Sequence, residues 1–72
     1  MLRRLGHVVA RRRILTGKSQ DDVTEVSGVS DRTWRALEAG SGNPSYLTLR
    51  AVATALGTDA ATLLREAETL DA

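Results

Sequence analysis

Apolar residues recur every three or four positions along most of the chain, which is the spacing of one face of an α-helix. No segment shows the strict alternation of apolar and polar residues that is typical of a half-buried strand. Glycines and short polar segments interrupt the pattern. It therefore predicts an all-α fold, a compact bundle of five short helices. These helices are expected at about residues 2–16, 19–27, 30–39, 46–56 and 59–70.

The residues at the predicted helix ends support these boundaries. Ser19, Ser30 and Asp59 can each cap the helix that follows, because a side-chain oxygen at this position accepts a hydrogen bond from an unpaired backbone N–H. Asp22, three residues after Ser19, completes a near capping box. Gly17 can end the first helix in the left-handed conformation that glycine adopts without strain.

The apolar faces of these helices define a candidate core. The first helix offers Leu2, Leu5 and Val9, with either Ile14 or Leu15 near its end. The fourth helix carries four apolar residues on one face, namely Leu49, Val52, Ala53 and Leu56. The fifth helix has more apolar residues than a monomer core obviously needs, so its face is either a dimer interface or an ordinary core helix. The candidate dimer residues are Leu63, Leu64, Ala67 and Leu70.

The 72 residues allow one small domain, residues 1–72. The chain has no cysteine, so its stability must come from helix packing or from oligomerisation rather than from disulfides or thiolate metal sites. Its apolar runs are too short for a membrane span, and its first residues do not form a signal peptide. A cytoplasmic protein without a membrane partner is expected.

The formal net charge of +1 conceals an uneven distribution. Residues 1–18 carry six basic side chains and no acid, whereas the rest of the chain has four basic and nine acidic side chains. The six are Arg3, Arg4, Arg11, Arg12, Arg13 and Lys18. This basic segment either faces a polyanion or forms a solvated helix surface.

Two short helices joined at Gly28 are typical of a helix-turn-helix, whose second helix can lie in the major groove of DNA. Over nearly its whole length the chain also resembles the lambdoid phage repressor and Cro family. The shared features are Arg13 four residues before Gly17, Ser19-Gln20, Gly28-Val29-Ser30, Thr33, Leu37-Glu38 followed by Gly40, Asn43-Pro44-Ser45, and Ala53 with Leu56-Gly57.

The resemblance implies a lambda-repressor-like DNA-binding domain with its helix-turn-helix at about residues 19–39. It further implies a transcription regulator, most commonly a repressor or a Cro-like switch protein, that binds a double-stranded DNA operator as a homodimer. Such a protein is encoded by a phage, a plasmid or a bacterial chromosome.

Three residues depart from the family pattern. Lys18 stands where an apolar residue is usual, and its stem can cover the core while its ammonium reaches a phosphate. Thr24 replaces a small alanine, and its hydroxyl is expected to donate to a carbonyl one turn earlier. Trp34 replaces isoleucine or valine.

Helical geometry separates two faces of residues 30–39. Trp34 and Leu37 share one face, whereas Arg32, Arg35 and Ala36 lie on the opposite one. Trp34 is therefore expected to be a core anchor whose indole N–H needs a partner, although stacking on DNA is the alternative. The opposite face carries the hydrogen-bonding groups.

The resemblance assigns base contacts to Asp31, Arg32, Thr33 and Ala36. Arg32 is the first choice, because a guanidinium can pair in bidentate fashion with guanine. Asp31 either accepts from a cytosine amino group or caps the helix. Thr33 can contact a phosphate or a thymine methyl, and Ala36 is small enough for a base edge to approach.

Phosphate contacts are expected around this helix, from Lys18, Gln20, Arg35, Ser41 and Asn43. Ordinary capping or turn roles are the alternative for Gln20 and Asn43. Arg11 and Arg12 are expected to add attraction that does not depend on the DNA sequence.

The resemblance also implies an ion pair between Arg13 and Glu38 that ties the first helix to the third. His7 is the only histidine, and no phosphate-binding glycine loop occurs, so an enzyme, a cofactor and a metal site are not expected. The main alternative to a DNA-binding regulator is an antitoxin or a protein-docking module of the same fold.

Overall fold

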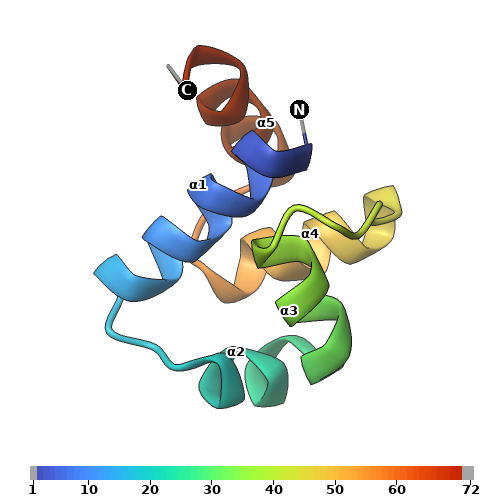
Figure 1. The fold of residues 1–72 in the computed structure, drawn as a ribbon. Helices are drawn as coiled ribbons and strands as arrows, with labels where there is room; N and C mark the ends of the chain where they lie inside the picture. The colour runs from blue at the N-terminus through green and yellow to red at the C-terminus, as the bar shows by residue number, and fades with distance from the viewer. Residues whose placement is uncertain (1, 71–72) are drawn as a thin grey trace.

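The computed structural model describes residues 2–70, which form five helices and, within this range, no strand (Figure 1). The helices are α1 (Leu2–Leu15), α2 (Gln20–Ser27), α3 (Asp31–Glu38), α4 (Tyr46–Ala55) and α5 (Ala60–Thr69). The all-α prediction is confirmed, and each helix lies within one residue of its predicted boundaries at either end.

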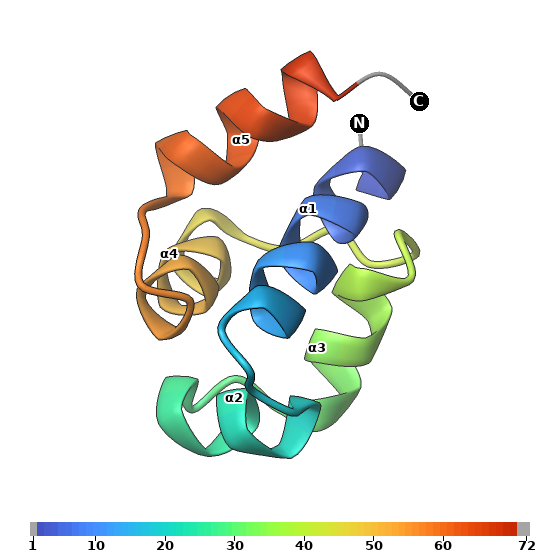
Figure 2. The same cartoon turned by 90° about the vertical axis from the view of Figure 1, so that its left-hand side faces the viewer.

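Helix α1 lies between α3 and α5, and α2 packs against α3 and α4 at the opposite end of the molecule from the end of α5 (Figure 2). Helix α4 also packs against α5. All five helices contribute to a single core. Its buried residues are Leu5, Val8, Val9, Val23, Trp34, Leu37, Leu49, Val52, Ala53, Ala55, Leu56, Ala60, Leu63 and Ala67.

The expected caps are present. Ser19 Oγ accepts from the backbone N–H of Asp22 (3.0 Å), and Asp22 Oδ2 accepts from that of Ser19 (2.9 Å), which completes the capping box. Ser30 and Asp59 accept from backbone N–H groups of α3 and α5. Gly17 has φ +75°, as its expected role in ending α1 requires.

The predicted apolar stripe of α1 is wrong at its end. Ile14 and Leu15 are 64% and 77% exposed, whereas Val8, which was not expected in the core, is buried. One turn beyond Val8 and Val9 the inward positions belong to Arg12 and Arg13, which pair with acids of neighbouring helices. Ile14 and Leu15 therefore come after the inward positions and do not extend the buried face.

The candidate dimer residues of α5 need a similar correction. Leu63 and Ala67 are fully buried in the core of their own chain, so they are not available to a second copy. Leu64 and Leu70 are partly buried and pack against that core. Most of the apolar face of α5 is thus explained by its contacts with α1 and α4.

Helix α1 touches the end of α3 backbone to backbone. A Cβ atom added to Gly6 would lie 2.4 Å from the carbonyl oxygen of Leu37 and 2.8 Å from that of Glu38. A Cβ added to Gly40, where φ is +73°, would lie 2.8 Å from Cα of Arg3. Glycine at these two positions allows an approach that any side chain would prevent.

Candidate nucleic-acid interface

The turn between α2 and α3 is held by a buried side chain and one hydroxyl. Gly28 adopts φ +74° and reverses the chain after α2. Trp34 is 0% exposed, and its Nε1 donates to Oγ of Ser27 (3.0 Å). The same Oγ accepts from the backbone N–H of Val29 (3.0 Å). Trp34 is therefore the expected core anchor, and a side chain so buried does not stack on DNA.

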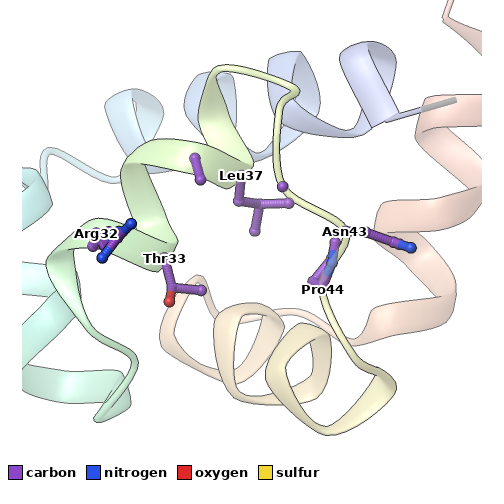
Figure 3. Close-up of a pocket in the computed structure, with 7 residues that line it drawn as sticks. Arg32, Thr33, Leu37, Asn43 and Pro44 are labelled. Carbon is purple, nitrogen blue, oxygen red and sulfur yellow. The ribbon is translucent and has the colours of Figure 1, made fainter.

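The outer face of α3 borders a shallow groove (Figure 3). The groove has a volume of about 270 Å³ and lies between α3 and the loop that leads to α4. It is lined by Arg32, Thr33, Ala36, Leu37, Gly42, Asn43 and Pro44. Three of the four expected base-contacting residues and one expected phosphate contact thus line one surface feature.

The residues that line this groove differ in exposure. Arg32 and Asn43 are exposed, whereas Thr33 and Ala36 are partly covered. Oγ1 of Thr33 accepts a hydrogen bond from Oγ of Ser30 (2.9 Å), which fixes its position on the first turn of α3. A flat, exposed guanidinium beside small side chains is the arrangement that suits a base edge.

In the loop after α3, several hydrogen-bond donors that were expected to be available to phosphate bind a backbone carbonyl of the same chain. The backbone N–H groups of Ser41 and Gly42 both donate to the carbonyl oxygen of Ala36 (3.0 and 3.2 Å). Oγ of Ser41 also donates to this oxygen (3.3 Å). Ser41 thus closes the end of α3, and its expected phosphate contact stays a prediction. Asn43 remains exposed.

Asp31 does not provide the side-chain cap of α3. The cap of α3 is Ser30, whose Oγ accepts from the backbone N–H of Thr33 (3.2 Å). Oδ2 of Asp31 accepts from Nε of Arg35 (2.7 Å), one turn later on the helix. Oδ1 is buried and has no hydrogen-bond partner among residues 2–70. Only Oδ2 is therefore accessible, and the expected contact with a cytosine amino group stays a prediction.

An ion pair joins α1, the start of α2 and α3. Arg13 donates to both carboxylate oxygens of Glu38, at 2.7 Å from Nε and 3.0 Å from Nη2. The two side chains are only 16% and 9% exposed. Nη1 of Arg13 donates to the carbonyl oxygen of Lys18 (3.0 Å), and Nε2 of Gln20 donates to Oε1 of Glu38 (3.2 Å). The hydrogen bond to Glu38 raises the pKa of Arg13.

The pair that the resemblance implied is therefore present, and Gln20 takes part in it. Its amide braces the end of α3 from the first turn of α2. Gln20 also lines a depression of about 420 Å³ between the two helices, together with Arg13, Ser19, Asp21 and Arg35. The phosphate contact expected of Gln20 stays a prediction.

Three basic residues of the segment 1–18 make contacts within the fold. Nζ of Lys18 donates to the carbonyl oxygen of Ala55 (3.0 Å), at the end of α4, and its expected phosphate contact stays a prediction. Arg12 forms a two-bond pair with Glu66 of α5, in which Nε donates to Oε1 at 3.1 Å. Arg11 lies 3.8 Å from the same carboxylate.

Thr24 also differs from expectation. Its Oγ1 is buried and has no hydrogen-bond partner among the described residues, so the expected bond to a carbonyl one turn earlier is absent. The carbonyl one turn before Thr24 belongs to Gln20, the first residue of α2.

The described residues form neither a metal-binding cluster nor a membrane-spanning helix. Residues 2–70 contain no group of three or more acidic or histidine side chains placed to hold a metal ion. None of their helices has the length and apolar character needed to cross a membrane.

The chain is similar to a known helix-turn-helix domain family and to solved structures. A family model described as a helix-turn-helix domain matches residues 4–67. The crystal structure of the restriction-modification controller protein C.AhdI from Aeromonas hydrophila is similar, with a TM-score of 0.82 and 27% identity over 86% of this chain and 94% of that one. No curated protein sequence matches significantly.

A crystal structure of a tyrosine-to-phenylalanine mutant of a second controller protein, C.Esp1396I, has a TM-score of 0.81. It is 20% identical over 97% of this chain and 94% of that one, a likeness that bears on the fold alone.

Proposed function

Because the chain belongs to the helix-turn-helix domain family, whose Cro-like members are DNA-binding transcription regulators, we propose that it reads the major groove of an operator with α3. The protein acts by binding DNA and needs no cofactor. It is located in the bacterial cytoplasm. The similarity to a restriction-modification controller protein supports regulation of transcription as its role.

The observation that carries this proposal is the division of α3 into two faces. Trp34 and Leu37 fix the helix in the core, so its position does not depend on DNA. Arg32 is exposed on the other face, beside the groove that Thr33, Ala36 and Asn43 also line. A helix that is rigidly held and presents a guanidinium and small side chains is suited to reading base edges.

Roles for the individual residues follow from these positions. We assign a bidentate contact with guanine to Arg32, contacts with a neighbouring base pair to Thr33 and Ala36, and phosphate contacts to Gln20 and Asn43. Arg35 is a further phosphate candidate beside Lys18 and Ser41, and it must first leave Asp31.

A two-fold homodimer on adjacent half-sites is part of the proposal, because helix-turn-helix proteins of this size bind half-sites about one turn of DNA apart. Leu64 and Leu70 remain candidates for its interface, since they are only partly buried in their own chain. Repression at its own promoter is the proposed outcome of binding.

The test is a mobility-shift assay with excess unrelated duplex. The probe is the tightest-binding duplex selected from a random pool, and DNA flanking its own gene is compared with it. Arg32→Ala is expected to weaken binding to the selected duplex by about 1–3 kcal/mol and to relax its sequence preference. Arg65→Ala, an exposed arginine on α5, is the matched control and should change binding little.

If the folded wild-type protein selects no sequence from the pool, the proposal is wrong and a protein partner becomes the better explanation. Equal losses in the two variants would show that charge alone, rather than base reading by α3, accounts for binding. Selection of a sequence that is absent near its own gene would remove autoregulation only.

A further inference from the structure

We propose that Asp31 sets the specificity of DNA binding by holding Arg35 in a pair along the surface of α3, which weakens binding to DNA of arbitrary sequence. Asp31 is thereby a positioning residue that acts through Arg35. This inference rests on the proposed function, because it concerns how α3 distinguishes its operator from other DNA.

The contacts of Asp31 favour this role over capping of α3. Ser30 already caps α3, one oxygen of Asp31 is buried without a partner, and the other accepts from Nε of Arg35 at 2.7 Å. The pair joins positions four apart on the helix, where two side chains meet on the same face. The Asp31 carboxylate is therefore directed at Arg35 and not at a base.

The surroundings of Arg35 are acidic. The pKa of Arg35 is raised chiefly by the hydrogen bond from its guanidinium to Asp31, and the charges of Asp21 and Glu38 add to the effect. Arg35 also borders the depression between α3 and the start of α2, where Ser19 and Gln20 lie. This is the edge of the proposed interface where a phosphate would pass.

A phosphate that approaches this edge must compete with Asp31 for the guanidinium. The pair is exposed, at 62% for Arg35 and 45% for Asp31, so it can open without disturbing the core. Binding to arbitrary DNA depends on phosphate contacts alone, so the loss of one donor matters most there. On the operator, base contacts by Arg32 hold α3 in place, so binding there depends less on whether Arg35 reaches a phosphate.

Asp31→Asn should therefore release Arg35 to phosphate. The dissociation constant is measured by fluorescence anisotropy at about 50 and about 200 mM salt, for the selected duplex and for a scrambled duplex of equal composition. We expect the variant to bind the scrambled duplex about threefold more tightly. The slope of log K against log salt should steepen by about 0.9, which corresponds to one additional phosphate contact.

Binding to the selected duplex should change less, so the ratio of the two affinities should fall. The same substitution in an Arg35→Ala background should have little effect, because no guanidinium is left to release. Glu68→Gln also removes one negative charge, but from α5 rather than from α3, so it controls for net charge. Thermal unfolding of each variant verifies that it is folded.

Three results would overturn the inference. The first is an equal effect of Glu68→Gln, which would leave only net charge as the cause. The second is an equal effect of Asp31→Asn with and without Arg35, which would show direct repulsion of phosphate by Asp31. A selective loss of binding to the selected duplex would make Asp31 a base-reading residue. Failure of the wild-type protein to select any sequence would instead contradict the proposed function.

Discussion

At the scale of single residues, Ser27 is the side chain on which the helix-turn-helix geometry depends most directly. Its Oγ accepts both from Nε1 of Trp34 and from the backbone N–H of Val29, at 3.0 Å each. One hydroxyl at the end of α2 thus joins the turn to the anchor of α3. The orientation of the proposed reading face follows from this connection.

Ser27→Ala should lower the free energy of unfolding by about 1–3 kcal/mol, because it leaves the buried indole N–H without an acceptor. Urea denaturation followed by tryptophan fluorescence measures the change. Ser41→Ala is the matched control, since Ser41 is exposed and its Oγ makes only a 3.3 Å bond to Ala36. Equal stability of the two variants would contradict the role given to Ser27.

The sequence predicted the burial of Trp34, because burial follows from the phase of the helix. It did not predict that Ser27 would be the partner, since that depends on how the turn at Gly28 brings two helices together. Thr24 shows the opposite case. Its hydroxyl was expected to find a carbonyl on its own helix and instead is buried without a partner among the described residues.

At the scale of helices, the contact between α1 and the end of α3 positions the reading helix on the core. Gly6 lies against the carbonyl oxygens of Leu37 and Glu38, and the Arg13–Glu38 pair reinforces the same contact two turns later. The family pattern predicted the pair, whereas Gly6 was not predicted to lie at this contact. A glycine inside a helix is a signal of close approach that was available in the sequence.

Gly6→Ala should destabilise the protein by about 1–3 kcal/mol, although alanine is the better helix former. The reason is that its Cβ would lie 2.4 Å from the Leu37 carbonyl oxygen, so α1 and α3 must separate. The free energy of unfolding by urea measures this. His7→Ala, at the neighbouring exposed position of α1, should leave stability unchanged or raise it. A Gly6→Ala variant as stable as His7→Ala would show that the contact is looser than described.

Helix boundaries were predictable because caps are local: Ser19, Ser30 and Asp59 act on N–H groups two or three residues away. Which apolar residues are buried was less predictable at the helix ends. Ile14 and Leu15 proved exposed because the arginines before them take the inward positions. The groove beside α3 could not be predicted, since its two walls meet only after α3 and the following loop have packed.

At the scale of the whole molecule, acid should weaken the fold through three carboxylates. The hydrogen bond from Arg12 lowers the pKa of Glu66, and capping bonds from backbone N–H groups lower the pKa values of Asp22 and Asp59. A carboxyl with a lower pKa in the folded than in the unfolded protein adds stability above its unfolded pKa, roughly 4. This stability is lost as the pH falls through the lower folded pKa.

The free energy of unfolding should therefore be nearly constant from about pH 7 to 5 and should fall below about pH 4. Urea denaturation at several pH values measures the profile. Glu66→Gln, which removes the charge that joins α5 to α1, should start less stable and lose less on acidification. A profile for this variant that runs parallel to that of the wild type would contradict a contribution of the Arg12–Glu66 pair.

The central claim is that α3 lies in the major groove with Arg32 on a guanine. Methylation interference tests it most directly, because dimethyl sulfate adds a methyl group to guanine N7 on the major-groove edge. On the selected duplex, methylation of particular guanines should prevent binding by the wild-type protein. With Arg32→Ala, one of these guanines in each half-site should cease to matter. Binding that tolerates methylation of every guanine N7, or an unchanged pattern in the variant, would contradict the account.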